Sequence, residues 1–270
     1  MRGFLITLLV LAALLAGADY AVRSVAEDQV ASRLQQALKL PVEPTVDVNG
    51  FPFLTQALAG SYDDVDLTAE NIAYQDLKDV TLTANLSGVS LPPQSLVDGD
   101  VESIPTRTVT ASARVTPEDL ARVLDVRDVT VAPLTDADLE RLRGEAEADS
   151  SGASGSARAL EGVDPSSSVQ LSSTTSVLGQ DLRVGVVASF RLTGGRIVLS
   201  ARDIRVDGTD DAVAGIAGSA LRSRLSGFSA TVDPGQLPFS ISATDLRAED
   251  GELVVSGTAR NVDILTTGGG

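Results

Sequence analysis

Residues 182–206 read LRVGVVASFRLTGGRIVLSARDIRV, and this stretch decides the fold class. Its apolar residues recur at every second position: Leu182, Val184, Val186, Ala188, Phe190 and Leu192. Gly194-Gly195 is the signal of a two-residue hairpin, and Ile197–Val206 follows as the partner strand. Strands with one apolar and one polar face are typical of an antiparallel sheet. Leu182–Thr193 extends about 40 Å at 3.3 Å per residue, so we expect a long sheet.

The same alternation recurs along the rest of the chain. It predicts further strands at residues 45–49, 64–69, 80–87, 108–115, 169–177, 239–246 and 252–262. Short helices are predicted where a capping residue precedes apolar positions, at Thr116-Pro117, Thr135-Asp136 and Thr209-Asp210. Strands and helices together predict an α+β fold.

A longer helix is predicted between Asp19 and Pro41. Its apolar positions recur at helical spacing: Val22, Val25, Ala26, Val30, Leu34, Ala37 and Leu38. Pro41 ends the pattern because proline cannot continue a helix. We expect this amphipathic helix to pack its apolar stripe on the sheet.

The N-terminus carries a targeting segment. Arg2 precedes the apolar run Phe4–Ala18, and Ala16-Gly17-Ala18 has the small residues of a cleavage site. The run is shorter than the roughly 20 residues that span a bilayer, and an extension to Val22 includes the charged Asp19. Residues 1–18 are therefore predicted to be a signal peptide or a membrane anchor. Either one places the protein outside the cytoplasm, in the cell envelope.

Residues 19–270 are predicted to form one domain. Within it, residues 144–168 are rich in Glu, Ala, Ser, Gly and Asp and contain few residues to bury. This composition predicts a flexible acidic insertion.

Composition excludes several functions. The formal net charge of −16 argues against a nucleic-acid partner, because phosphates are bound by basic surfaces. The chain has no Cys and no His, which removes thiolate catalysis, the usual general base and the commonest transition-metal ligands. Asp63, Asp64 and Asp66 form the densest carboxylate group, but a solvated strand face explains them without a metal. We predict no cofactor, no metal and no catalytic residue.

The loop Asn49-Gly50-Phe51-Pro52-Phe53 places two of only six phenylalanines around one proline. Pro52 disfavours helix at Phe51 but can start a short helix, Phe53–Ala59, that Gly60 closes. One interpretation is a plug that closes one end of the core. The other is the apolar rim of a cavity that holds a lipid.

Two motifs carry a family resemblance: GFPFLTQALAGSYDDVDL at residues 50–67, and LVVSGTARNV at residues 253–262, which follows Leu237-Pro238-Phe239. Together they resemble the actinobacterial LmeA-like phospholipid-binding family, from Asp19 to about Ile264. The resemblance implies a tubular, BPI/TULIP-like lipid-binding fold, in which a long curved antiparallel sheet wraps around the amphipathic helix and acyl chains. It also implies a role in lipid or lipoglycan assembly in the envelope, and it carries over no catalytic residue.

The first hypothesis is a non-enzymatic protein that holds phospholipid acyl chains in an apolar groove at the outer face of the cytoplasmic membrane. The residues predicted to line the groove are Phe51, Phe53, Leu54, Leu58, Phe190, Ile216, Leu221, Phe228 and Phe239. The alternatives are an envelope scaffold with a packed core and an unknown protein partner, and a carboxylate-dependent hydrolase.

Overall fold

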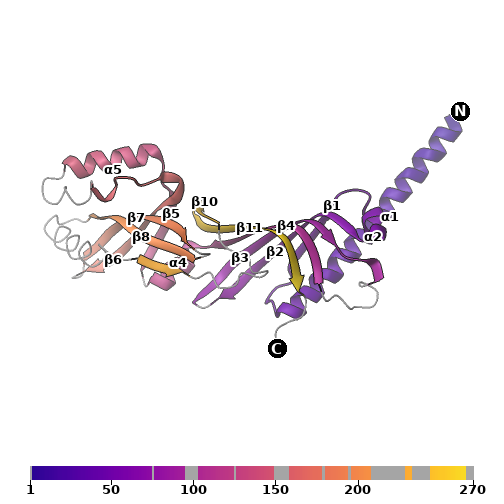
Figure 1. Ribbon diagram of the computed structural model, residues 1–270, viewed down its shortest axis with the longest axis horizontal. Coiled ribbons are helices and arrows are strands. Elements are labelled where there is room, and N and C mark those ends of the chain that lie inside the picture. The colour runs from indigo at the N-terminus through magenta and orange to yellow at the C-terminus, as the bar shows by residue number, and fades with distance from the viewer. Residues whose placement is uncertain are drawn as a thin grey trace.

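The structure is a computed structural model that describes residues 2–74, 76–94, 103–124, 126–148, 158–177, 180–193, 196–207, 229–232 and 244–265. It has two antiparallel sheets in an elongated body, and a long N-terminal helix leaves the body at one end (Figure 1). The predicted α+β class and the antiparallel pairing are confirmed. The strands are divided between two sheets, where the sequence predicted one long sheet.

The first sheet has six strands in the order β1-β2-β3-β4-β11-β10. The strands are β1 (Thr45–Asn49), β2 (Ser61–Tyr74), β3 (Leu77–Ser90), β4 (Ser103–Val115), β10 (Asp245–Glu249) and β11 (Glu252–Leu265). Because β11 pairs with β4, the end of the chain completes a sheet that its first third begins.

The register of this sheet separates apolar from polar side chains. Val48, Val65, Leu86, Val109 and Ala259 are consecutive partners and form one apolar row across five strands. The row beside it lies on the opposite face and is polar throughout: Asn49, Asp64, Ser87, Thr108 and Arg260. A slip of one residue would exchange the two faces, so burial of the apolar row specifies the register.

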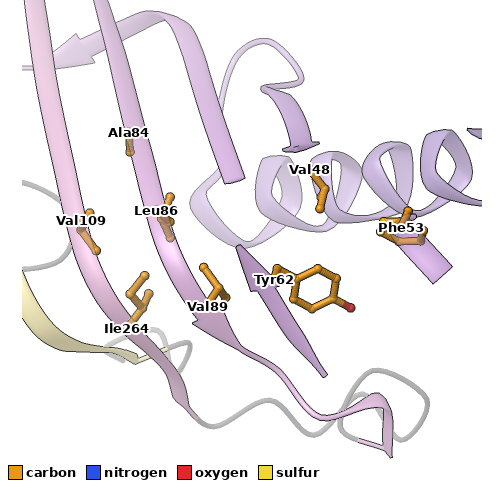
Figure 2. Packing of buried hydrophobic residues seen from close by; sticks show 8 residues of the cluster. All are labelled: Val48, Phe53, Tyr62, Ala84, Leu86, Val89, Val109 and Ile264. Atoms are coloured by element: carbon orange, nitrogen blue, oxygen red, sulfur yellow. The ribbon is translucent and has the colours of Figure 1, made fainter. Parts of the chain in front are cut away.

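The main core of this sheet lies under its apolar face. Its buried members are Val48, Phe53, Tyr62, Ala84, Leu86, Val89, Val109 and Ile264 (Figure 2). Figure 2 shows the rings of Phe53 and Tyr62 at the helix end of the cluster, whereas Ala84 and Leu86 lie along β3. Apolar burial of this kind stabilises the fold by about 25 cal/mol per Å².

Helix α1 (Arg2–Leu38) contacts the sheet only along its second half, and its N-terminal half projects away from the body (Figure 1). The predicted packing stripe was wrong for Val22 and Val25, which are 45% and 60% exposed. Leu38 of the predicted stripe is also exposed, whereas Ala26 packs against the main core and the polar Glu27 faces β1. Glu27 accepts a hydrogen bond from the backbone N–H of Val48 at 2.7 Å and another from Arg23 Nε at 2.7 Å. The bond from Val48 satisfies one N–H group of the edge strand β1, which an apolar side chain cannot do.

The second sheet has the order β5-β6-β7-β8-β9. Its strands are β5 (Arg127–Pro133), β6 (Ser168–Val177), β7 (Gln180–Thr193), β8 (Arg196–Asp207) and β9 (Ser229–Val232). The pairing of Thr193 with Arg196 confirms the predicted hairpin, although Gly194 and Gly195 themselves lie outside the described residues. The helix α4 (Pro117–Leu124) connects the two sheets, and α5 (Asp136–Ala148) follows β5.

The ends of the predicted 144–168 insertion are part of the body. Residues 144–148 are the last part of α5, and a 3-10 turn, η1 (Pro165–Ser167), precedes β6. Ala146, Leu160 and Val163 are buried, and Leu160 and Val163 join a cluster with Val187 of β7. Isolated apolar residues at irregular spacing produce no periodic signal, so the sequence pattern did not show this burial. Residues 149–157 lie outside the described part of the chain.

The two sheets share a core where β10 meets the second sheet. Leu246 and Ala248 of β10 pack with residues of β5, β6 and β7: Val129, Val131, Val169, Ala188 and Phe190. We call this set the junction cluster. It makes the two sheets one continuous body in its described part.

Candidate functional site

The apolar face of the first sheet has a middle row of mostly short side chains. Leu67, Ala84, Ala111 and Gly257 are consecutive partners across β2, β3, β4 and β11. The row on one side contains Leu86 and Val109, and the row on the other contains Leu82 and Val255. We call the middle row the small-residue row, because three of its four members are Ala or Gly.

This apolar face is not fully covered away from α1. Leu67, Leu82, Ala111 and Val255 are half-buried, whereas Ala84 and Gly257 of the small-residue row are buried. Within the described residues α1 contacts β1 and α2, and Ala26 of α1 also packs against the main core of the sheet. The half-buried part of this face therefore offers apolar area, lined by short side chains, to a ligand whose shape is not fixed.

The polar face of the same sheet carries the carboxylates that the sequence singled out. Asp64 and Asp66 accept hydrogen bonds from the side-chain amides of Asn49 and Asn85, at distances from 2.6 to 3.3 Å. Each amide thus bridges the same two carboxylates. Among the residues that the structure describes, no three acidic side chains lie together in a way that could hold a metal ion. The cluster is explained as a cross-strand network on a solvated face.

A second feature lies where α1 leaves the body. The helix α2 (Phe53–Ala59) packs against α1 there. The Asp19 carboxylate of α1 accepts the N–H of Phe53 at 2.9 Å and the N–H of Leu54 at 2.8 Å. Pro52 precedes the helix and provides no side-chain cap, so Asp19 satisfies the N–H groups that a cap would satisfy.

The two phenylalanines of the opening loop have different environments. Phe53 is 4% exposed, and its ring lies 6.2 Å from that of Tyr62. Phe51 is 73% exposed, and Leu58 of α2 is 80% exposed. Leu54 is also exposed, so α2 carries an apolar surface made of Phe51, Leu54 and Leu58. We call it the α2 surface.

The N-terminal half of α1 adjoins the α2 surface. Its large apolar side chains are exposed: Phe4, Leu5, Ile6, Leu8, Leu9, Val10, Leu11, Leu14 and Leu15. It is the one helix in the described part of the chain that is long and apolar enough to cross a membrane. Thr7 donates its hydroxyl to the Gly3 carbonyl at 3.0 Å, so this polar group is satisfied within the helix.

The predicted lipid-binding residues do not all lie together. Phe51, Leu54 and Leu58 are exposed and close to one another in the chain, and Phe53 is buried in the main core. Phe190 lies in the junction cluster of the other sheet. Ile216, Leu221, Phe228 and Phe239 lie outside the described residues.

Two parts of the site were missed by sequence reasoning. Asp19 is the only charged residue between Gly3 and Arg23, and this isolation in an apolar run was an available signal of a structural role. The small-residue row had no such signal, because Ala84, Ala111 and Gly257 become neighbours only through the strand register.

An open concavity of about 410 Å³ lies along α1, lined among the described residues by Val25, Asp28, Gln29, Ser32 and Arg33. All of these residues except Val25 are polar in type, and none is a predicted lipid-binding residue. The apolar sheet face and the α2 surface therefore remain the stronger candidates.

Comparison with known proteins identifies the family. The model of the LmeA-like phospholipid-binding family matches residues 17–258. The chain belongs to this family. The recognition made from the residue 50–67 and 253–262 motifs is confirmed, and the match covers both sheets of this LmeA-like protein. No curated protein and no solved structure gives a significant match.

Proposed function

We propose that this LmeA-like protein holds the acyl chains of a phospholipid on the apolar face of its first sheet. Family membership supports a phospholipid as the ligand. The observation that supports this placement is the small-residue row, in which Leu67 and Ala111 are half-buried and short side chains leave space on the apolar face. Acyl chains vary in length and conformation, and binding by apolar area tolerates this variation.

The location and role follow from the same features. The exposed apolar half of α1 supports export and contact with the outer face of the cytoplasmic membrane. A tubular fold related to the BPI/TULIP proteins is consistent with long antiparallel strands beside one long helix. The net charge of −16 is unfavourable for nucleic acid and for general adhesion to anionic lipid. The proposed role is non-enzymatic support of lipid or lipoglycan assembly in the envelope.

An envelope scaffold with a packed core is the second candidate. The burial of Phe53 against Tyr62 favours it, because the loop then acts as a plug for this end of the core. The two candidates differ in whether a lipid accompanies the protein through gentle purification.

Native mass spectrometry of the full chain, released from membranes in mild detergent, tests the proposal. We expect one or more phospholipid masses on the protein. Ala111→Phe fills the small-residue row and should remove most of the bound lipid, while Thr110→Phe, on the polar face of the same strand, should not. A folded protein without lipid in repeated preparations would support the scaffold and contradict the carrier.

A further inference from the structure

Asp19 is the residue that makes the N-terminal helix too short to span a bilayer when the sequence is considered alone. A carboxylate in hydrocarbon is costly, so the apolar run ends at Ala18. In the structure Asp19 is 5% exposed, and its two oxygens accept the N–H groups of Phe53 and Leu54. The carboxylate is turned to α2 and is shielded by it from the surroundings of α1.

With Asp19 covered, the apolar surface of α1 continues past it. Tyr20 and Val22 are exposed on the same helix, and Ala21 between them is small. Residues 3–22 then provide about 30 Å of helix at 1.5 Å per residue, which equals the hydrocarbon thickness of a typical bilayer. The helix is continuous from Arg2 to Leu38, so the span leads directly into the body.

The α2 surface is fixed to this helix at the level of Asp19. The two hydrogen bonds join the first turn of α2 to α1, and the two helices are in contact. The helix α2 lies beside α1 (Figure 1), and Phe51, Leu54 and Leu58 are exposed there. An aromatic and two leucines at this level match the composition of segments that lie in the membrane interface.

We propose that residues 3–22 are a retained membrane span and that the α2 surface docks into the leaflet from which the body emerges. The occupant of the α2 surface is the phospholipid bilayer, because the surface is joined to a span that the same bilayer contains. Two attachments, the span and α2, set the tilt of the body at the membrane. This inference does not depend on the sheet binding lipid.

The proposal is tested with the full chain reconstituted in vesicles of phosphatidylethanolamine and phosphatidylglycerol. Because the chain has no cysteine, a single introduced cysteine is the only site for a thiol-reactive, environment-sensitive fluorophore. Leu58→Cys reports on the α2 surface, and Thr130→Cys, exposed on β5 of the second sheet, is the matched control. Nitroxide-labelled lipids in the same vesicles quench a fluorophore that lies in the leaflet.

We expect blue-shifted emission and strong quenching at position 58, and neither at position 130. Equal emission and quenching at the two positions would overturn the docking of α2. The mass of the protein recovered from its host membrane tests the span: a chain that begins near Asp19 overturns it, and a chain that retains residues 3–18 supports it. Ala111→Phe added to Leu58→Cys should leave the quenching unchanged, which separates docking from lipid binding by the sheet.

Discussion

Three carboxylates in the described part of the chain, on Asp19, Glu27 and Asp119, accept hydrogen bonds from backbone N–H groups. Asp19 accepts two from α2, Glu27 accepts one from β1, and Asp119 of α4 accepts two from the start of β3. Each joins an element to a neighbour that is distant in the chain. An acid is suited to this position because an ionised carboxylate can accept several bonds, and charge-assisted bonds are the stronger ones.

The contribution of Asp119 to the stability of the fold depends on pH. Burial raises the pKa of its carboxyl, but the N–H groups of Asp79 and Lys78 and the guanidinium of Arg122 outweigh burial and hold the pKa below its usual range. A pKa lowered by folding stabilises the protein above the unfolded-state pKa, near 4, and this contribution is lost as pH falls through the folded-state pKa.

We therefore expect Asp119→Asn to lower the free energy of unfolding by about 2 kcal/mol at pH 7. The difference from the unchanged protein should shrink steadily below about pH 4, where the unchanged protein also becomes protonated. Urea unfolding followed by circular dichroism across this range measures it. A difference that stays constant from neutral to acid pH contradicts the assignment. Glu118→Gln, exposed one residue earlier on α4, is the control.

At the scale of elements, the corner between α2 and β2 depends on Gly60. This residue ends α2 in the left-handed region at φ 64°, and its N–H bonds to the carbonyl of Ala57. A Cβ placed on Gly60 would lie 2.9 Å from the Cα of Pro92 and 3.0 Å from the carbonyl oxygen of Leu91. The backbone N–H of Leu91, just after β3, also donates a hydrogen bond to the carbonyl oxygen of Gly60 at 2.8 Å. This bond joins the C-terminal end of α2 to the sheet.

Gly60→Ala should lower the free energy of unfolding by about 2 kcal/mol, because it combines an unfavourable φ with a backbone clash. Gly144→Ala in α5 is the matched control. It has open space around the new Cβ and an ordinary helical position, so it should stabilise by about 0.5–1 kcal/mol. Thermal unfolding of both variants measures the two effects. Shifts in the same direction would show that space and φ at Gly60 do not matter.

Local chemistry explains which elements the sequence predicted. Helix Phe53–Ala59 was predicted with the bounds that the structure shows, because Pro52 and Gly60 mark both ends. Strand β5 was missed, although Val129 and Val131 are buried at alternate positions, because the run is short and has no turn signal before it. The exposure of Val22 and Val25 on α1 was also missed. Periodicity predicts an amphipathic helix, but it does not say which side chains of the helix contact an edge strand that needs hydrogen-bond partners.

At the scale of the whole molecule, the candidate site depends on long-range pairing. The sequence singled out Phe51, Leu54 and Leu58 as candidates, because they lie within ten residues of one another. It did not locate the small-residue row, whose members Ala84, Ala111 and Gly257 come from three distant strands. Alanine and glycine carry no chemical signal of their own, so only the register reveals them.

The register also brings β10 to the boundary between the sheets. Leu246 is 1% exposed in the junction cluster, whose other members belong mostly to β5, β6 and β7. The chain crosses the boundary at α4 and crosses back between β9 and β10, and the junction cluster adds side-chain packing between the sheets to these covalent connections. The junction cluster is therefore the part of the core on which cooperative unfolding of the two sheets depends.

Leu246→Ala should lower the free energy of unfolding by about 2–5 kcal/mol and separate the unfolding of the two sheets. Leu142→Ala is the matched control, because Leu142 is 2% exposed in a cluster confined to the second sheet. It should destabilise by a similar amount without changing how the first sheet unfolds. Hydrogen exchange of the two sheets, followed residue by residue in denaturant, distinguishes the variants. If Leu246→Ala still exchanges both sheets in one cooperative step, the shared core does not couple them.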